Sequence, residues 1–334
     1  AGYPTSDGVI LSAGFAQDNV FGSGKSVSID VNTSKSQRTY AFSLTEPYIT
    51  PEGISRNWDV YDRRVDLDEL DVADVAYETI GGGISFGVPV TESDPVFLGT
   101  RWDMTKVDLR SASPQRYKTF VDEYGENPQS LLLTLGWSRD SRDNVLAPTR
   151  GRYQRLSGEV SVPGLDTQYY RATYQITQYV PITNSWTLGL NAQVGYGDTY
   201  GNDKIFPFFK NFYAGGIGSV RGYESSSLGP KDENDDNLGG TQQLVFSAEL
   251  LTPLPGADRT LRGLLFLDGG NVWGYSGKTK QSTNMDLSDL RYSWGVGVAW
   301  ISPLGPLKFS IAFPLSDKDR EDTQRIQFQT PTGF

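Results

Sequence analysis

The residue types that most often carry out catalysis are missing from this sequence, which has no His and no Cys in 334 residues. Without His there can be no Ser-His-Asp triad, no imidazole base and no His-ligated metal. Without Cys there can be no disulfide, thiolate nucleophile or Cys-ligated zinc. What remains is electrostatic chemistry, in which guanidinium groups and carboxylates pair where water is excluded. The sequence therefore predicts a protein that is not an enzyme and that holds no metal and no cofactor.

One arginine lies in an unusual setting. Arg221 is part of the segment 211–223, which reads NFYAGGIGSVRGY and places four glycines among aromatic residues. Such a chain can turn tightly, and the planar guanidinium can be positioned to pair with a carboxylate through two hydrogen bonds. The surrounding polar stretch 197–240 is far longer than a loop without a function usually is. On these residues alone, a flexible surface loop with an incidental Arg explains the segment equally well.

Alternating side chains indicate which elements must position this loop. The segment 291–300 reads RYSWGVGVAW, with Tyr, Trp and Val on one face and Ser, Gly and Ala on the other. Successive side chains of a strand point to opposite faces. The same alternation recurs in 186–196 and 307–313, and the second face carries little charge. The pattern favours strands between lipid and a polar lumen over the strands of a soluble sandwich.

Sixteen segments of this kind predict an all-β protein, a sixteen-stranded antiparallel transmembrane β-barrel with long extracellular loops. No apolar run reaches the length of about 18 residues that a transmembrane helix requires. Short turns alternate with long polar loops, and the even number of strands places both termini on the periplasmic side. The three glycines 81–83 are expected to bend or bulge the wall. The expected strands are 1–4, 8–18, 24–33, 36–46, 54–63, 76–88, 95–108, 129–139, 151–162, 168–180, 186–197, 241–252, 261–273, 288–301, 307–315 and 323–334.

Charge and terminal composition add further expectations. The net charge of −10 argues against nucleic acid as the main partner. The first residues contain no basic and apolar regions of a signal peptide. Residues 1–334 are therefore expected to form a single barrel domain, with any signal peptide outside this chain. The charged runs 231–236 and 317–322 are expected to be solvated loop tips, because neither has the spacing of a calcium loop.

Several motifs together resemble one family. The segment 211–223 resembles the loop-six signature of the BamA family of outer-membrane protein assembly factors, and it is followed by LGP at 228–230. The QDNVFGSG run at 17–24 and the EPY run with EG at 46–53 resemble turns of that family. The same holds for the DSRD and PTRG runs within 140–151, and SPLGPLKFS at 302–310 is similar to its hairpin. The resemblance extends over nearly the whole chain.

The resemblance assigns roles to the long loop and two acidic residues. It implies that Val220, Arg221, Gly222 and Tyr223 form the loop-six motif, and that Arg221 packs inside the lumen against Glu249 and Asp268. The alternation within 246–250 and 265–268 also turns both acids inward, where a carboxylate is less costly than on the lipid face. Phe266 would then face the lumen as well. Without the resemblance, the acids could equally be solvated and unpaired.

The resemblance also implies a seam where the first and last strands pair weakly. Some relatives have a Gly where the last strand kinks inward, but this chain has Pro331 at that position, so any kink has another chemical cause. A disulfide that can hold the long loop in relatives is impossible here. The chain ends in an aromatic residue, as bacterial outer-membrane barrels typically do. The seam and last-strand residues are Gly2, Tyr3, Gln327, Phe328, Gln329, Pro331, Gly333 and Phe334.

By resemblance, the expected function is to fold and insert β-barrel proteins into the outer membrane of a Gram-negative bacterium through this seam, a lateral gate. The expected partners are unfolded outer-membrane proteins, outer-membrane lipid, and accessory lipoproteins that bind through periplasmic domains outside this chain. Two other functions stay open: a secretion barrel of the same superfamily that moves polypeptides through its lumen, and a passive porin. A hydrolase is disfavoured because the chain has no His.

Overall fold

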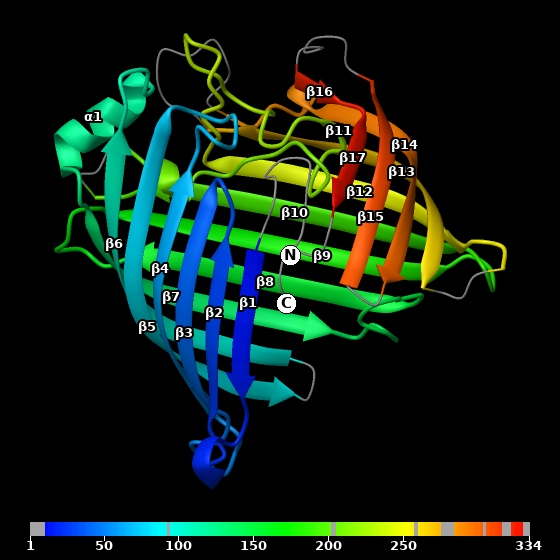
Figure 1. The fold of residues 1–334 in the computed structure, drawn as a ribbon, viewed down its shortest axis with the longest axis horizontal. Coiled ribbons are helices and arrows are strands. Elements are labelled where there is room, and N and C mark those ends of the chain that lie inside the picture. Colours follow the sequence, from blue (N-terminus) through cyan, green and yellow to red (C-terminus); the bar gives the residue numbers. More distant parts are fainter. Residues whose placement is uncertain are drawn as a thin grey trace.

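Fifteen antiparallel strands pair in chain order to form one strongly curled sheet (Figure 1). The computed structural model describes residues 11–91, 94–201, 205–256, 260–274, 284–302, 305–315 and 322–329. Among these residues, only consecutive strands of the sheet are neighbours, with β10 followed directly by β12 and β15 followed by β17. A second, two-stranded sheet joins β11 to β16. The curled sheet surrounds an interior into which the long loop folds (Figure 1).

The strands of the main sheet are β1 Leu11–Gln17, β2 Ser26–Thr33, β3 Gln37–Glu46, β4 Ser55–Asp66, β5 Val75–Thr91, β6 Asp94–Leu109, β7 Gln129–Asp140, β8 Gly151–Ser161, β9 Tyr169–Pro181, β10 Thr187–Thr199, β12 Gln242–Pro253, β13 Leu261–Trp273, β14 Arg291–Ser302, β15 Gly305–Pro314 and β17 Ile326–Gln329. The small sheet consists of β11 Gly222–Tyr223 and β16 Thr323–Gln324. The helical elements are α1 Gln115–Tyr124, η1 Val20–Gly22, η2 Phe208–Lys210 and η3 Leu287–Asp289.

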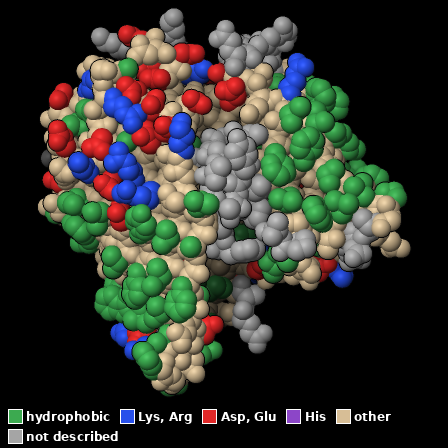
Figure 2. Space-filling model, viewed as in Figure 1, with side chains coloured by type: hydrophobic (Ala, Val, Ile, Leu, Met, Phe, Trp, Pro, Cys, Tyr) green, Lys and Arg blue, Asp and Glu red, His purple; other side chains and the backbone are tan. Residues whose placement is uncertain are grey.

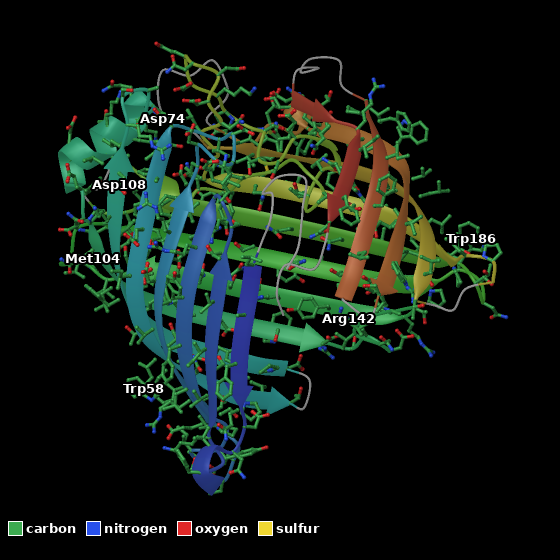
Figure 3. The ribbon with its side chains drawn as sticks, viewed as in Figure 1. Trp58, Asp74, Met104, Asp108, Arg142 and Trp186 are labelled. Carbon is green, nitrogen blue, oxygen red and sulfur yellow. The ribbon has the colours of Figure 1, made fainter. Side chains whose placement is uncertain are left out.

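The predicted all-β barrel fold is confirmed, and each expected strand from 8–18 onward has a counterpart in the sheet. The expected first strand, 1–4, lies outside the described residues. The expected last strand, 323–334, is divided in its described part: β16 pairs with the long loop, and β17 pairs with β15. The long loops and α1 lie at one end of the strands, beside Asp74 and Asp108, whereas Arg142 and Trp186 mark the end with the short turns (Figure 3).

Strand β13 illustrates how alternation separates the two faces of the sheet. Leu265 and Leu267 are 48% and 45% exposed, whereas Phe266 and Asp268 between and after them are 5% and 0% exposed. Large apolar side chains of the other strands are exposed in the same way, among them Trp294 and Trp300 of β14. Hydrophobic side chains cover broad areas of the visible face, and charged side chains gather above them, over the part that carries α1 (Figure 2). This is the distribution expected of a barrel wall that faces lipid.

Two local expectations need correction. Residues 109–127 lie between the expected strands 95–108 and 129–139, where only a long polar loop was expected, yet they contain α1, which follows Pro114 and precedes Gly125. The glycines 81–83 were expected to bend or bulge the wall; a bulge is absent there, because pairing with β4 and β6 continues through them and the register shift lies between Pro89 and Thr91. Gly81 has a steric role instead, because a Cβ there would approach the Tyr61 hydroxyl and an Asp103 carboxylate oxygen to 2.6 Å.

No helix in the described part of the chain combines the length and the apolar character needed to cross a bilayer.

Candidate functional site

The long loop between β10 and β12 packs against the inner face of the sheet. Its residues Phe212, Ala214, Val220, Tyr223 and Leu228 are buried in one apolar cluster together with Val245 of β12 and Val272 of β13. Backbone bridges join Phe212 to Gly240 and Ala214 to Leu228, so the two limbs of the loop lie side by side. The loop therefore has an apolar core of its own, which decides against the flexible surface loop that its residues alone left open.

Arg221 is fixed between two carboxylates of the wall. Its Nε and Nη2 donate to the two oxygens of Asp268 at 2.6 Å each, a bidentate pair, and Nη1 donates to Glu249 Oε1 at 2.7 Å. The backbone N–H of Arg221 also donates to Asp268, at 3.1 Å. Arg221 is 2% exposed and Asp268 is fully buried. Because an unpaired charge in such a place is costly, this geometry holds the loop firmly to β12 and β13.

Neighbouring side chains complete this contact, which we call the Arg221 anchor. Ser247 donates to Asp268 Oδ1 at 2.6 Å and accepts from Arg221 Nη2 at 3.1 Å. Lys308 of β15 donates to Glu249 Oε1 at 2.8 Å, so that two cations face two carboxylates. The guanidinium carbon lies 3.5 Å from the centroid of the Phe266 ring, and this cation–π contact explains the aromatic residue on the inner face.

The loop-six motif continues directly into a contact with the end of the chain. Gly222 has a φ of 90°, a conformation that favours glycine, and this turn places Gly222 and Tyr223 beside Thr323 and Gln324. The Gln327 side chain, 1% exposed, donates to the Tyr223 carbonyl at 2.7 Å and accepts from the Gly222 N–H at 3.3 Å. Strand β17 is thus held by the loop from inside as well as by β15.

The structure brings the motif residues 220–223, Glu249, Asp268 and Gln327 together. Val220 and Tyr223 are fully buried, and the Tyr223 hydroxyl donates to the Tyr292 carbonyl at 3.2 Å. Phe328 and Gln329 belong to β17 and pair with Phe309 and Lys308 of β15. Gly2, Tyr3, Pro331, Gly333 and Phe334, the other residues assigned to the seam, lie outside the described residues.

Sequence reasoning missed several residues that hold the loop. Ser247 and Lys308 of the wall and Lys210 of the loop were not singled out, although the alternation that turned Glu249 inward also turned Ser247 inward. The charged runs 231–236 and 317–322 were expected to be solvated tips, but Lys231 Nζ lies 2.6 Å from Asp322 and neither side chain is more than 22% exposed. This ion pair ties the loop to the segment that precedes β16, and it does so in a chain that cannot form a disulfide.

The interior beside the loop is polar. A cavity of about 710 Å³ borders the loop between β9, β10, β12 and β15, and its lining includes Gln175, Asn191, Gln193, Gln243 and Lys308. Amide side chains such as these can hydrogen-bond water or a peptide backbone. Within the described ranges, no group of three or more His, Cys, Asp or Glu residues has the arrangement of a metal site. The arrangement can position a loop and a strand by charge and hydrogen bonding.

Comparison with known proteins identifies the family. The sequence model of the family described as the Omp85 superfamily domain matches residues 19–334. The chain belongs to the Omp85 superfamily. It is 40% identical over 370 aligned residues to the outer membrane protein assembly factor BamA of Neisseria meningitidis, a match that covers 100% of this chain and 46% of the relative. The chain spans about half the length of the curated relatives it matches.

Two solved structures are similar over almost the whole fold. The structure of BamA from Haemophilus ducreyi lacking POTRA domains 1–3 has a TM-score of 0.88 and 25% identity, covering 98% of this chain and 68% of that one. CdiB from Acinetobacter baumannii has a TM-score of 0.61 at 14% identity, covering 98% of this chain and 56% of that one. The second likeness concerns the fold alone. The first structure is the better match in both fold and sequence.

Proposed function

We propose that this chain forms the membrane barrel of an outer-membrane protein assembly factor, which folds and inserts other β-barrel proteins into the outer membrane of a Gram-negative bacterium. The full coverage of this chain by a relative named for that activity supports the proposal. The structural observation that carries it is the contact between the last strand and the loop: Gln327 of β17 bonds to the backbone of Tyr223 and Gly222 on the inner side of the sheet.

A last strand that can separate from the first suits this activity for a physical reason. A β-strand entering a bilayer carries backbone N–H and C=O groups, and each unsatisfied group costs several kcal/mol in lipid. A barrel that opens between its first and last strands offers an edge on which the incoming strand can pair by β-augmentation. In this proposal Gln327, Phe328 and Gln329 belong to one side of the gate, and Gly2 and Tyr3 to the other.

The loop controls the inner side of this gate. Arg221 fixes the loop to β12 and β13, and Gln327 joins β17 to the backbone of the same loop. The last strand can move outward only when the bonds of Gln327 break, because Gly222 and Tyr223 are held in place. The loop-six motif therefore acts in gating, and Glu249 and Asp268 are its anchors in the wall. Neither a covalent step nor a cofactor is needed.

The remaining parts of the proposal follow from a barrel of this kind. Residues 1–334 form a single outer-membrane domain, and both termini face the periplasm. The partners are unfolded outer-membrane proteins and the surrounding lipid, together with accessory lipoproteins that bind through periplasmic domains of the whole protein. The main alternative is a secretion barrel of the same superfamily, which would share the loop-six motif. A porin is disfavoured because a porin loop is not expected to carry the set formed by Arg221, Glu249 and Asp268.

The test is reconstitution of the full-length protein in liposomes with an unfolded outer-membrane barrel as substrate. We expect the protein to accelerate folding of the substrate into the bilayer, measured by the gel mobility shift between folded and unfolded barrels. A secretion barrel would instead transfer a soluble polypeptide across the bilayer and leave barrel folding at the rate of empty liposomes. That second result would reject the proposal in favour of the alternative.

The gate can be tested separately by cross-linking, since the chain has no Cys of its own. Gln329→Cys is combined in turn with Cys at each of residues 1–5, and pairs that form a disulfide are assayed before and after reduction. We expect oxidation to stop substrate folding and reduction to restore it. Unchanged folding with the disulfide fully formed would contradict a gate at this seam, without contradicting the assembly activity.

A further inference from the structure

A second cation of the long loop contacts the wall far from Arg221. Lys210 ends the short helix η2, eleven residues before Arg221 in the chain. Its Nζ lies 3.6 Å from Asp103 Oδ2 of β6 and 3.4 Å from Glu159 Oε1 of β8, so that the side chain spans β7. The side chains of Lys210, Asp103 and Glu159 are 19%, 6% and 16% exposed. All three groups are therefore largely removed from water.

Both carboxylates are held in place by tyrosines. The Tyr61 hydroxyl of β4 donates to Asp103, and the Tyr169 hydroxyl of β9 donates to Glu159 Oε1 at 3.3 Å. Lys210 Nζ also lies 5.7 Å from the centroid of the Tyr169 ring. Gly81 leaves the space that the contact between Tyr61 and Asp103 occupies. The site that receives the ammonium group is thus built from several strands and is not a chance surface pair.

The backbone at Lys210 is fixed by aromatic packing on its N-terminal side. The Phe208 ring stacks on Tyr117 of α1 with 4.1 Å between centroids, and Phe206 packs edge-on against Tyr169 at 5.5 Å. After Lys210, Asn211 donates to the Leu238 carbonyl at 2.8 Å. Lys210 therefore lies where the loop leaves its aromatic contact with α1 and begins to follow the inner face of the sheet.

We propose that Lys210 is a second positioning residue of the loop, which acts on the gate through Arg221 and Gln327. The Arg221 anchor fixes one end of segment 210–221 to β12 and β13, and Lys210 fixes the other end to β6 and β8. With both ends held, Gly222 and Tyr223 stay in the place where Gln327 of the last strand binds them. Removal of the ammonium group takes away the cation that Asp103 and Glu159 share. Segment 210–221 is then held at only one end and can move. This role rests on the proposed function.

The experiment measures the position of the loop and the activity independently. Spin labels on Ile217→Cys and Gln175→Cys, which both border the interior cavity, report the distance between the loop and β9. We expect Lys210→Gln to broaden or shift this distance distribution in the full-length protein, and to slow substrate folding by roughly fivefold or more, a range typical of coupled sites. Lys210→Arg, which keeps the charge, should restore both values.

Lys106→Gln is the matched control. Lys106 belongs to the same strand as Asp103, but its side chain is 54% exposed beside Asp108, so the same change of charge should alter neither measurement. Glu159→Gln removes one of the two acids and serves as a milder variant if Lys210→Gln does not fold. It should shift the distance in the same direction and by less.

Two results would overturn the role of Lys210. One is a distance distribution and a folding rate in Lys210→Gln equal to those of the unaltered protein. The other is an equal defect in Lys210→Arg and Lys210→Gln, which would assign the effect to packing and not to charge. If the unaltered protein does not accelerate barrel folding at all, the proposed function fails, whereas the distance measurement still decides whether Lys210 positions the loop.

Discussion

Two clusters of charged residues, one inside the sheet and one at the rim that carries α1, use the same residue types in opposite surroundings. Inside, the Arg221 side chain is 3% exposed and meets Glu249 and Asp268, with Lys308 as a second cation. At the rim, the Arg110 side chain is 36% exposed and meets Asp66, Asp68 and Asp74 at 2.6, 2.9 and 3.4 Å. Figure 2 shows charged side chains gathered over this upper part of the molecule.

The difference concerns charge balance as well as burial. The inner cluster is balanced because each charge there has lost its water and must be compensated by a partner. At the rim, acids outnumber the arginine, since water and salt screen the excess charge. We infer that the inner cluster determines where the loop lies, whereas the rim cluster contributes little to stability and responds to pH.

The largest effect is expected from Arg221→Ala. It leaves Asp268 buried without its bidentate partner, and breaking a buried pair in this way costs about 3–5 kcal/mol. We expect a loss of that size in the free energy of unfolding, measured by urea titration in detergent micelles with tryptophan fluorescence. The substrate-folding activity should also fall, because Gly222 and Tyr223 are then free to leave Gln327.

A double variant sharpens this result. Asp268→Asn alone removes the charge that Arg221 faces, and in combination with Arg221→Ala it removes the uncompensated carboxylate. The double variant should therefore be more stable than Arg221→Ala alone. If Arg221→Ala lowers the free energy of unfolding by less than about 1 kcal/mol, which is the range of exposed ion pairs, water reaches the inner cluster more freely than its geometry indicates.

A much smaller effect is expected from Arg110→Ala at the rim. Exposed ion pairs typically contribute about 0.2–1 kcal/mol, and their contribution falls as salt is added. We expect a loss in this range at low ionic strength, measured by the same urea titration, and almost none in concentrated salt. A loss comparable with that of Arg221→Ala would remove the distinction between the two clusters.

The sequence predicted only part of the inner cluster. The alternation of side chains along β12 and β13 turns Glu249 and Asp268 inward, and the family resemblance identifies Arg221 as their partner. Lys308 and Lys210 could not be found in this way, because alternation states which face a side chain occupies but not which distant residue it meets. Gln327 was assigned to the seam for its place in the last strand, yet its bonds to the loop depend on the fold of a separate segment.

Helix α1 shows a different limit. Pro114 before it and Gly125 after it are the usual signals for the beginning and the end of a helix, so the sequence did contain the information. The helix was missed because long polar loops are expected between the strands of a barrel. Its buried residues are Tyr117 and Phe120. Their burial depends on Phe208 from another loop, a contact that no local pattern indicates.

The smallest predicted effect concerns pH, and Asp236 at the rim carries it. Burial, together with the nearby Asp232, Asp74 and other acids, raises the pKa of Asp236 to about 6 from an ordinary value of 3.8. In the short turn between β7 and β8 the opposite holds: burial would raise the pKa of Asp143, but hydrogen bonds from Thr149 and Arg150 lower it to about 2.

The two shifts predict stability changes of opposite sign. As pH falls from 7 through 6, folded Asp236 takes up a proton that the unfolded chain binds only near pH 3.8, so its contribution to stability rises. Asp236→Asn should remove that rise and be the more stable protein at neutral pH, by less than about 1 kcal/mol because the rim is wet. Asp143 contributes stability at neutral pH that is lost as pH falls from about 4 towards 2, so Asp143→Asn should be less stable at pH 7.

Urea titrations of the two variants between pH 7 and 5 separate these cases. If the difference in stability between Asp236→Asn and the unaltered protein does not change with pH, the rim acids do not repel one another. The contrast with the balanced inner cluster would then depend on burial alone.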